Sequence, residues 1–148
     1  MNESTPVLVS ACLLGVRCRY DGEERLDRAL LDQLRRDGCV IIPMCPEQLG
    51  GLPTPRPPAE IKGGDGRDVL SGRAVLTNVE GADVTAAYLR GAGEALRLAR
   101  RLGCRRAVLK EKSPACGVAW IKQGDADVPG MGVAAALLSS EGVELAGW

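Results

Sequence analysis

Short apolar runs alternate with longer amphipathic stretches along this chain. Three runs rich in β-branched and small apolar residues predict strands at Val7–Val9, Cys39–Ile42 and Ala107–Leu109. Between the first two, leucines recur at helical spacing opposite charged residues, which predicts a crossover helix that ends at Gly38. Strands joined in this way are typical of parallel sheets. We therefore expect an α/β fold: a single domain over residues 1–148 with a Rossmann-like, open, mostly parallel sheet and crossover helices.

The second half of the chain predicts two further helices and a terminal strand. Apolar positions from Val84 to Ala99 follow a helical period, which predicts a helix over residues 83–102 that Gly103 ends. A second helix is expected at about Gly132–Ser140, followed by a short strand at Val143–Leu145. These elements complete the alternation of helix and strand.

Three segments lack a clear helical period. Residues 44–68 contain five prolines and five glycines, which exclude a continuous helix or a central strand and predict a long, ordered, functional loop. Asp68–Leu70 and Arg73–Thr77 flank a Ser-Gly pair and predict a small hairpin. The stretch Lys112–Gly130 is expected to be a loop. The longest irregular segments thus follow the predicted strands.

Charge and composition limit the partners. The chain has 19 basic and 19 acidic residues and only 3% aromatic residues, which argues against attraction of its whole surface to nucleic acid or membrane. A local group of arginines is interpreted as a solvated helix end or a modest contact for phosphate or RNA: Arg97, Arg100, Arg101, Arg105 and Arg106. The N-terminal segment has neither a signal-peptide pattern nor a membrane span, so we expect a cytoplasmic protein.

Three of the six cysteines follow a predicted strand: Cys12, Cys45 and Cys116. Because the carboxyl ends of parallel strands meet at one edge, where ligands bind in open α/β sheets, we expect these three thiols to form one site. Cys39 and Cys104 precede strands and belong at the opposite edge. Cys18 lies in the loop after Cys12, from which it can approach the site. In a reducing compartment such cysteines are more typical of metal ligands, catalytic groups or buried side chains than of disulfides.

The residue types narrow the chemistry. Histidine is absent, which excludes every nucleophile activated by histidine. Four thiolates including Cys18 suit a closed zinc site, whereas three leave an open position on zinc or on one iron of a 4Fe-4S cluster. The lack of histidine and the long, rigid loops favour the cluster, although the spacing alone does not choose the metal. Glu47 is a candidate base, with a solvated or helix-starting carboxylate as the alternative. Ser113 is a candidate ligand-binding hydroxyl, and residues 110–112 are interpreted as a solvated charge run.

Four segments, SACLLGVRCRYDGE, CPEQLGGLPTPRPPAEI, KSPACG and the terminal GVAAALL, together resemble a bacterial family long carried as a domain of unknown function, whose characterised members are thiouracil desulfidases. The resemblance implies that Cys12, Cys45 and Cys116 hold a 4Fe-4S cluster with one open iron. It also implies that Glu47 and Ser113 are catalytic. The family often has serine before the last cysteine of KSPACG, where this chain has Ala115, and we expect this difference to alter substrate preference.

The expected function is removal of sulfur from a small thiolated pyrimidine, of thiouracil or thiouridine type, to give the oxo form and sulfide without net electron transfer. The loop from Leu49 to Pro58 is expected to roof the pocket, and Arg56 to contact substrate or a carboxylate. Two alternatives remain: a non-catalytic iron-sulfur or zinc binding module, and a desulfidase of thiolated tRNA, which the arginine group motivates. The sequence carries no prediction of oligomeric state.

Overall fold

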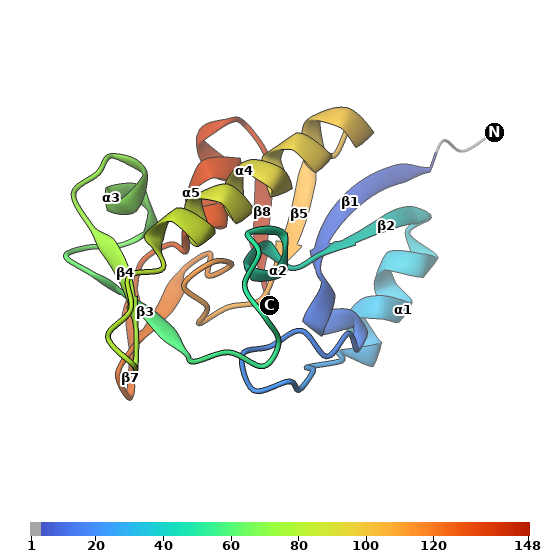
Figure 1. Cartoon of the computed structure of the whole chain (residues 1–148). Coiled ribbons are helices and arrows are strands. Elements are labelled where there is room, and N and C mark those ends of the chain that lie inside the picture. The colour runs from blue at the N-terminus through green and yellow to red at the C-terminus, as the bar shows by residue number, and fades with distance from the viewer. Residues whose placement is uncertain (1–3) are drawn as a thin grey trace.

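The core of the molecule is a parallel sheet whose strand order reverses beside its first strand. The computed structural model describes residues 4–148, so residues 1–3 of the segment inspected for a signal peptide lie outside it. The sheet consists of β1 (Thr5–Ser10), β2 (Cys39–Met44), β5 (Arg106–Leu109) and β8 (Glu144–Gly147), in the order β2-β1-β5-β8 (Figure 1). All three strand pairings are parallel. The chain moves from β1 to one side and then returns to the other, which opens a crevice at the carboxyl ends of β1 and β5.

Helices cover both faces of this sheet. On one face, Val7 and Val9 pack with Leu30 and Leu34 of α1 (Arg28–Arg36). The alternate residue Leu8 faces the other way, into a larger cluster with α4 (Thr85–Leu102) and α5 (Val133–Ser140) (Figure 1). This alternation of side chains along β1 is what a strand covered on both faces requires. The predicted α/β class and the predicted helices and sheet strands are therefore confirmed.

The predicted hairpin of Asp68–Leu70 with Arg73–Thr77 is wrong. Residues Gly66–Leu70 form a short helix, α3, because Asp65 and Asp68 make a reciprocal capping box at its start. Instead, β4 (Val75–Asn78) pairs antiparallel with β3 (Ala59–Lys62), which lies at the end of the proline-rich segment. The capping interaction outweighs the turn preference of the Ser-Gly pair.

The two segments expected to be loops contain short elements. Residues 44–68 are ordered, as predicted, and include α2 (Pro46–Leu49) as well as β3. The stretch Lys112–Gly130 is more than a loop, since it contains an antiparallel hairpin of β6 (Trp120–Gln123) and β7 (Ala126–Pro129). The Gly124 backbone N–H donates a hydrogen bond to the Glu60 carboxylate at 2.6 Å, and this bond connects the hairpin to β3. These small sheets stand beside the carboxyl edge of the central sheet and add a wall to the crevice (Figure 1). Within residues 4–148, no helix is long and apolar enough to cross a membrane.

Candidate active site

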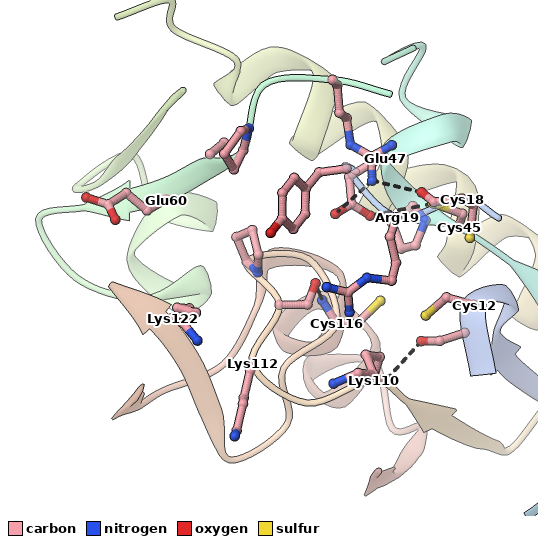
Figure 2. Close-up of a pocket in the computed structure, with 18 of the residues that line it drawn as sticks. Cys12, Cys18, Arg19, Cys45, Glu47, Glu60, Lys110, Lys112, Cys116 and Lys122 are labelled. Atoms are coloured by element: carbon pink, nitrogen blue, oxygen red, sulfur yellow. Dashed lines mark hydrogen bonds and ion pairs between the residues drawn. The ribbon is translucent and has the colours of Figure 1, made fainter. Parts of the chain in front are cut away.

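Four cysteines from three connections line one cavity at the carboxyl edge of the sheet. Cys12 lies in a 3-10 turn (Ala11–Leu14) directly after β1, and Cys45 follows β2 as the residue that starts α2. Cys116 lies in the loop after β5, and Cys18 in the connection after Cys12. The cavity has a volume of about 650 Å³. Figure 2 shows the four thiols on one side of it, with Glu60, Lys112 and Lys122 on the far side. Cys39, by contrast, begins β2 at the opposite edge.

Cys18 changes the acidity of two neighbouring thiols. It can donate a hydrogen bond to the thiolate of Cys12 or of Cys45, and this lowers the pKa of both despite the opposing effect of burial. The same contacts raise the pKa of Cys18 itself. Burial, reinforced by the charge of Glu47, raises the pKa of Cys116 well above its ordinary value. The arrangement thus favours thiolates at Cys12 and Cys45 and leaves Cys18 as a protonated donor; a cationic group would be needed to deprotonate Cys116.

Glu47 is held inside the site by the start of α2. Proline at the first position of this short helix fixes its beginning. Glu47 is the second residue of the helix, two residues after Cys45. The carboxylate is buried, and its Oε1 lies 3.7 Å from the Cys45 Sγ. Its Oε2 lies 3.7 Å from the Arg56 guanidinium, whose side chain is only 5% exposed. The interpretation of Glu47 as a solvated loop charge is therefore wrong, whereas its place as a charge at the start of a helix is confirmed. Arg56 offsets the charge of this buried carboxylate.

Arg56 also ties the roof of the cavity to the segment that carries Cys18. Its Nη2 donates to the Cys18 carbonyl at 3.0 Å, and its Nη1 donates to the Pro53 carbonyl at 3.3 Å. The Arg56 backbone N–H donates to the Tyr20 carbonyl at 2.8 Å. Arg56 and Pro58 both line the cavity. Arg56 was expected to contact substrate or a carboxylate, and the structure shows the contact with a carboxylate, that of Glu47.

Ser113 organises the loop that carries Cys116. Its Oγ accepts the backbone N–H groups of Ala115, at 3.1 Å, and of Cys116, at 3.0 Å. These two bonds occupy the oxygen as an acceptor and leave the hydroxyl proton free to donate into the cavity, which Ser113 lines. The loop packs tightly on the start of α5: a Cβ on Gly132 would lie 2.4 Å from the Ala115 carbonyl carbon. Glycine at this position therefore permits the close approach.

The interpretation of residues 110–112 as a solvated charge run is wrong for Glu111. Its Oε1 accepts three successive backbone N–H groups, from Val118, Ala119 and Trp120, at 2.8, 3.1 and 3.2 Å. Glu111 thereby closes the loop that contains Ser113 and Cys116. A side chain on Gly147 of β8 would meet the Glu111 carboxylate at 2.1 Å, so glycine there makes room for it.

Two further residues of the cavity wall were not predicted to belong to the site; Lys110 was expected in the solvated charge run of residues 110–112. Lys110 lines the cavity and is half-buried. Its pKa is lowered mainly by desolvation and, to a smaller extent, by repulsion from Arg19. Tyr88 of α4 lines it as well, although its helical spacing marked it only as a core position. The sequence signal for this role was a phenol on an otherwise apolar helix face. Such a hydroxyl needs a polar neighbour, in the core or at a site.

Comparison with known proteins bears on this cavity directly. A family model described as 2-thiouracil desulfurase matches residues 7–147. The chain belongs to this family. An uncharacterized protein YbbK of Bacillus subtilis (strain 168) is 42% identical over 142 residues, which cover 92% of this chain and 91% of that protein. A solved structure, described as 4Fe-4S-dependent thiouracil desulfidase TudS, has a TM-score of 0.83 and 40% identity over 98% of this chain and 91% of that one. Membership of the 2-thiouracil desulfurase family confirms the resemblance noted in the sequence.

Proposed function

We propose that this chain is an iron-sulfur desulfidase that converts a thiolated pyrimidine, of thiouracil or thiouridine type, into its oxo form and sulfide. Its family and its likeness to a thiouracil desulfidase support this activity. The observation that carries the proposal is the cavity at the carboxyl edge, where four thiols stand beside a buried carboxylate and a serine hydroxyl. Such a cavity joins a metal-binding surface to acid and base groups.

We assign Cys12, Cys45 and Cys116 as the ligands of a 4Fe-4S cluster with one open iron. Within residues 4–148, no three His, Cys, Asp or Glu side chains converge closely enough to hold a single metal ion. A single zinc binds every thiolate at about 2.3 Å, so its sulfurs must converge on one point. In a cluster, each cysteine binds a different iron and the thiolates stand around a larger group. Three thiols on three connections of one cavity therefore fit the cluster better than zinc.

Cys18 has a different role in this assignment. We propose that Cys18, whose thiol can donate to those of Cys12 and Cys45, stands beside the cluster as a donor rather than binding it as a fourth thiolate. With three thiolate ligands, a bound cluster would have one iron without a protein ligand, available to a substrate. When bound, the cluster supplies a Lewis-acidic iron that attracts the thiocarbonyl sulfur.

The reaction is a hydrolysis: a C=S bond and water become a C=O bond and hydrogen sulfide. Glu47 accepts a proton from the attacking water, and Arg56 keeps its carboxylate in place through the 3.7 Å ion pair. Ser113, whose hydroxyl proton is free, donates to the substrate or to the departing sulfur. We also propose that the segment from Leu49 to Pro58, of which Arg56 and Pro58 line the cavity, limits the entry of water. No oxidant or reductant is required.

A small substrate fits these surfaces better than tRNA. The arginine group lies around the end of α4 and the start of β5, which is the edge of the sheet opposite the cavity. Arg100 in this group pairs with Glu141 at 2.7 Å and is 62% exposed, as expected of a solvated helix end. All six cysteines are free thiols, which supports our proposal that the protein works in the reducing cytoplasm.

The direct test is sulfide release. Protein purified and reconstituted without oxygen should release sulfide from 2-thiouracil, 4-thiouracil or 4-thiouridine and form the corresponding oxo compound. Glu47→Gln should reduce kcat by at least about 100-fold, the usual contribution of a general base, with iron content unchanged. Glu144→Gln, at an exposed carboxylate on β8, is the matched control. No release from any of these substrates by cluster-loaded protein would contradict the proposal and favour the non-catalytic binding module.

A further inference from the structure

The residue with the clearest unassigned role is Tyr88, because the fold holds it rigidly beside Glu47. α2 and α4 touch backbone to backbone: a Cβ on Gly91 would lie 1.9 Å from the Pro46 carbonyl oxygen. From the other side, a Cβ on Gly50 would lie 2.0 Å from the Ala87 carbonyl oxygen. These glycines allow the helix that carries Tyr88 to lock against the helix that carries Glu47. The packing of the two helices therefore fixes the positions of the Tyr88 and Glu47 side chains relative to each other at the cavity wall.

The Tyr88 hydroxyl is a polar group with no hydrogen-bond partner among residues 4–148. The side chain is 4% exposed and lines the cavity, yet its hydroxyl makes no hydrogen bond to any group in residues 4–148. Among the same residues, the one fully enclosed side-chain nitrogen or oxygen without a partner is the Nε of Arg19, so the Tyr88 hydroxyl retains access to the cavity. A buried tyrosine normally finds a partner for its hydroxyl. The hydroxyl is therefore a polar group at the cavity wall that a bound ligand can engage.

The chemistry of the partner follows from the surroundings. Burial, and after it the charge of Glu47, raises the pKa of Tyr88, so the phenol stays protonated and serves as a donor. Its hydroxyl proton is therefore available to a ligand that offers an acceptor. A pyrimidine that carries one sulfur and one oxygen has such an acceptor in its carbonyl, on a different ring carbon from the one that loses sulfur.

We infer that Tyr88 is a specificity-determining residue that donates a hydrogen bond to the carbonyl oxygen retained by the thiolated pyrimidine. The inference rests on the proposed function and adds the feature by which the substrate is recognised. Ser113 and Glu47 serve the reacting carbon and sulfur, while Tyr88 binds the carbonyl that the ring retains. The site thus selects pyrimidines that combine a thiocarbonyl with a second, oxygen-bearing carbon.

The test compares Tyr88→Phe with wild type in the cluster-loaded protein. The first substrate is 4-thiouracil, which retains a carbonyl, and the second is pyrimidine-4-thione, which lacks it. Loss of one neutral hydrogen bond should raise the KM for 4-thiouracil about fivefold, with kcat little changed. The KM for pyrimidine-4-thione should be the same in both proteins. Ser140→Ala, which removes an exposed hydroxyl at the end of α5, is the control and should change neither value.

A second readout needs no turnover. Calorimetry should show that Tyr88→Phe also weakens the binding of uracil about fivefold, with iron content and visible absorption unchanged. Equal KM values for 4-thiouracil in variant and wild type, or an equal loss for both substrates, would overturn the inference, since the hydroxyl would then make no selective bond. If wild type releases no sulfide but uracil binding still depends on Tyr88, the proposed reaction fails while this recognition contact stands.

Discussion

Replacing Arg56 by methionine removes the group that offsets the charge of Glu47. The two side chains are 5% and 11% exposed and their closest charged atoms lie 3.7 Å apart. Removing one partner of a buried pair leaves an uncompensated charge, which costs about 3–5 kcal/mol. Arg56 also donates to the Cys18 carbonyl at 3.0 Å and to the Thr54 Oγ1 at 3.2 Å. We therefore expect Arg56→Met to lower the free energy of unfolding by at least about 3 kcal/mol.

Urea unfolding of the cluster-free protein under reducing, oxygen-free conditions measures this change. The matched control is Arg73→Met, whose side chain is 69% exposed and pairs with Asp68 at 3.2 Å. An exposed pair of this kind contributes at most about 1 kcal/mol. The double variant Arg56→Met, Glu47→Gln should recover part of the loss, because the uncompensated charge is gone. If Arg56→Met costs no more than Arg73→Met, the ion pair with Arg56 does not compensate the buried charge of Glu47.

Three further predictions concern the framework of the site. Gly91→Ala should destabilise the protein by about 1–3 kcal/mol, since its Cβ would meet the Pro46 carbonyl oxygen at 1.9 Å, whereas Gly93→Ala, with nothing within 4 Å, should be neutral or stabilising in thermal melts. Glu111→Ala should lower both the melting temperature and the iron bound per chain, because three backbone N–H groups of the Cys116 loop lose their acceptor; unchanged iron content would contradict this. Asp65 loses solvation on burial, but hydrogen bonds from Arg67 and Met131 outweigh this effect and lower its pKa, so its contribution to stability is present above the pKa of the unfolded chain and is lost as the pH falls through the folded value. Asp65→Asn should accordingly flatten the acid side of the stability profile measured by urea unfolding, and an unchanged slope would show that Asp65 does not contribute.

The positions of the cysteines were accessible from the sequence because they depend on local patterns. Each predicted strand is a short apolar run, and the residues after parallel strands must meet at one edge of the sheet. Cys12, Cys45 and Cys116 follow strands in this way, and the structure places all three on the walls of one cavity. Their role as cluster ligands, together with the catalytic roles of Glu47 and Ser113, stays a prediction.

The remaining features depend on contacts between distant segments. β3 and β4 pair across α3 rather than through a turn, so their pairing has no local turn signal. The hairpin of β6 and β7 does carry one, the two-residue loop Gly124-Asp125, which the expectation of a loop over residues 112–130 passed over. Glu111 looked like a member of a charged run, because only the fold brings three backbone N–H groups to its carboxylate. Tyr88 has the spacing of a core residue, and the empty space beside its hydroxyl is visible only once α2 and α4 are packed.

The central claim is that thiols at the carboxyl edge hold an iron-sulfur cluster, and its most direct test is a count of iron and acid-labile sulfide per chain in protein purified without oxygen. Cys45→Ser is compared with Cys39→Ser. Cys39 is the first residue of β2, whereas Cys45 directly follows the last. We predict about four irons, the content of a cubane cluster, in wild type and in Cys39→Ser, and their loss in Cys45→Ser. One zinc per chain in wild type, or four irons retained in Cys45→Ser, would contradict the account.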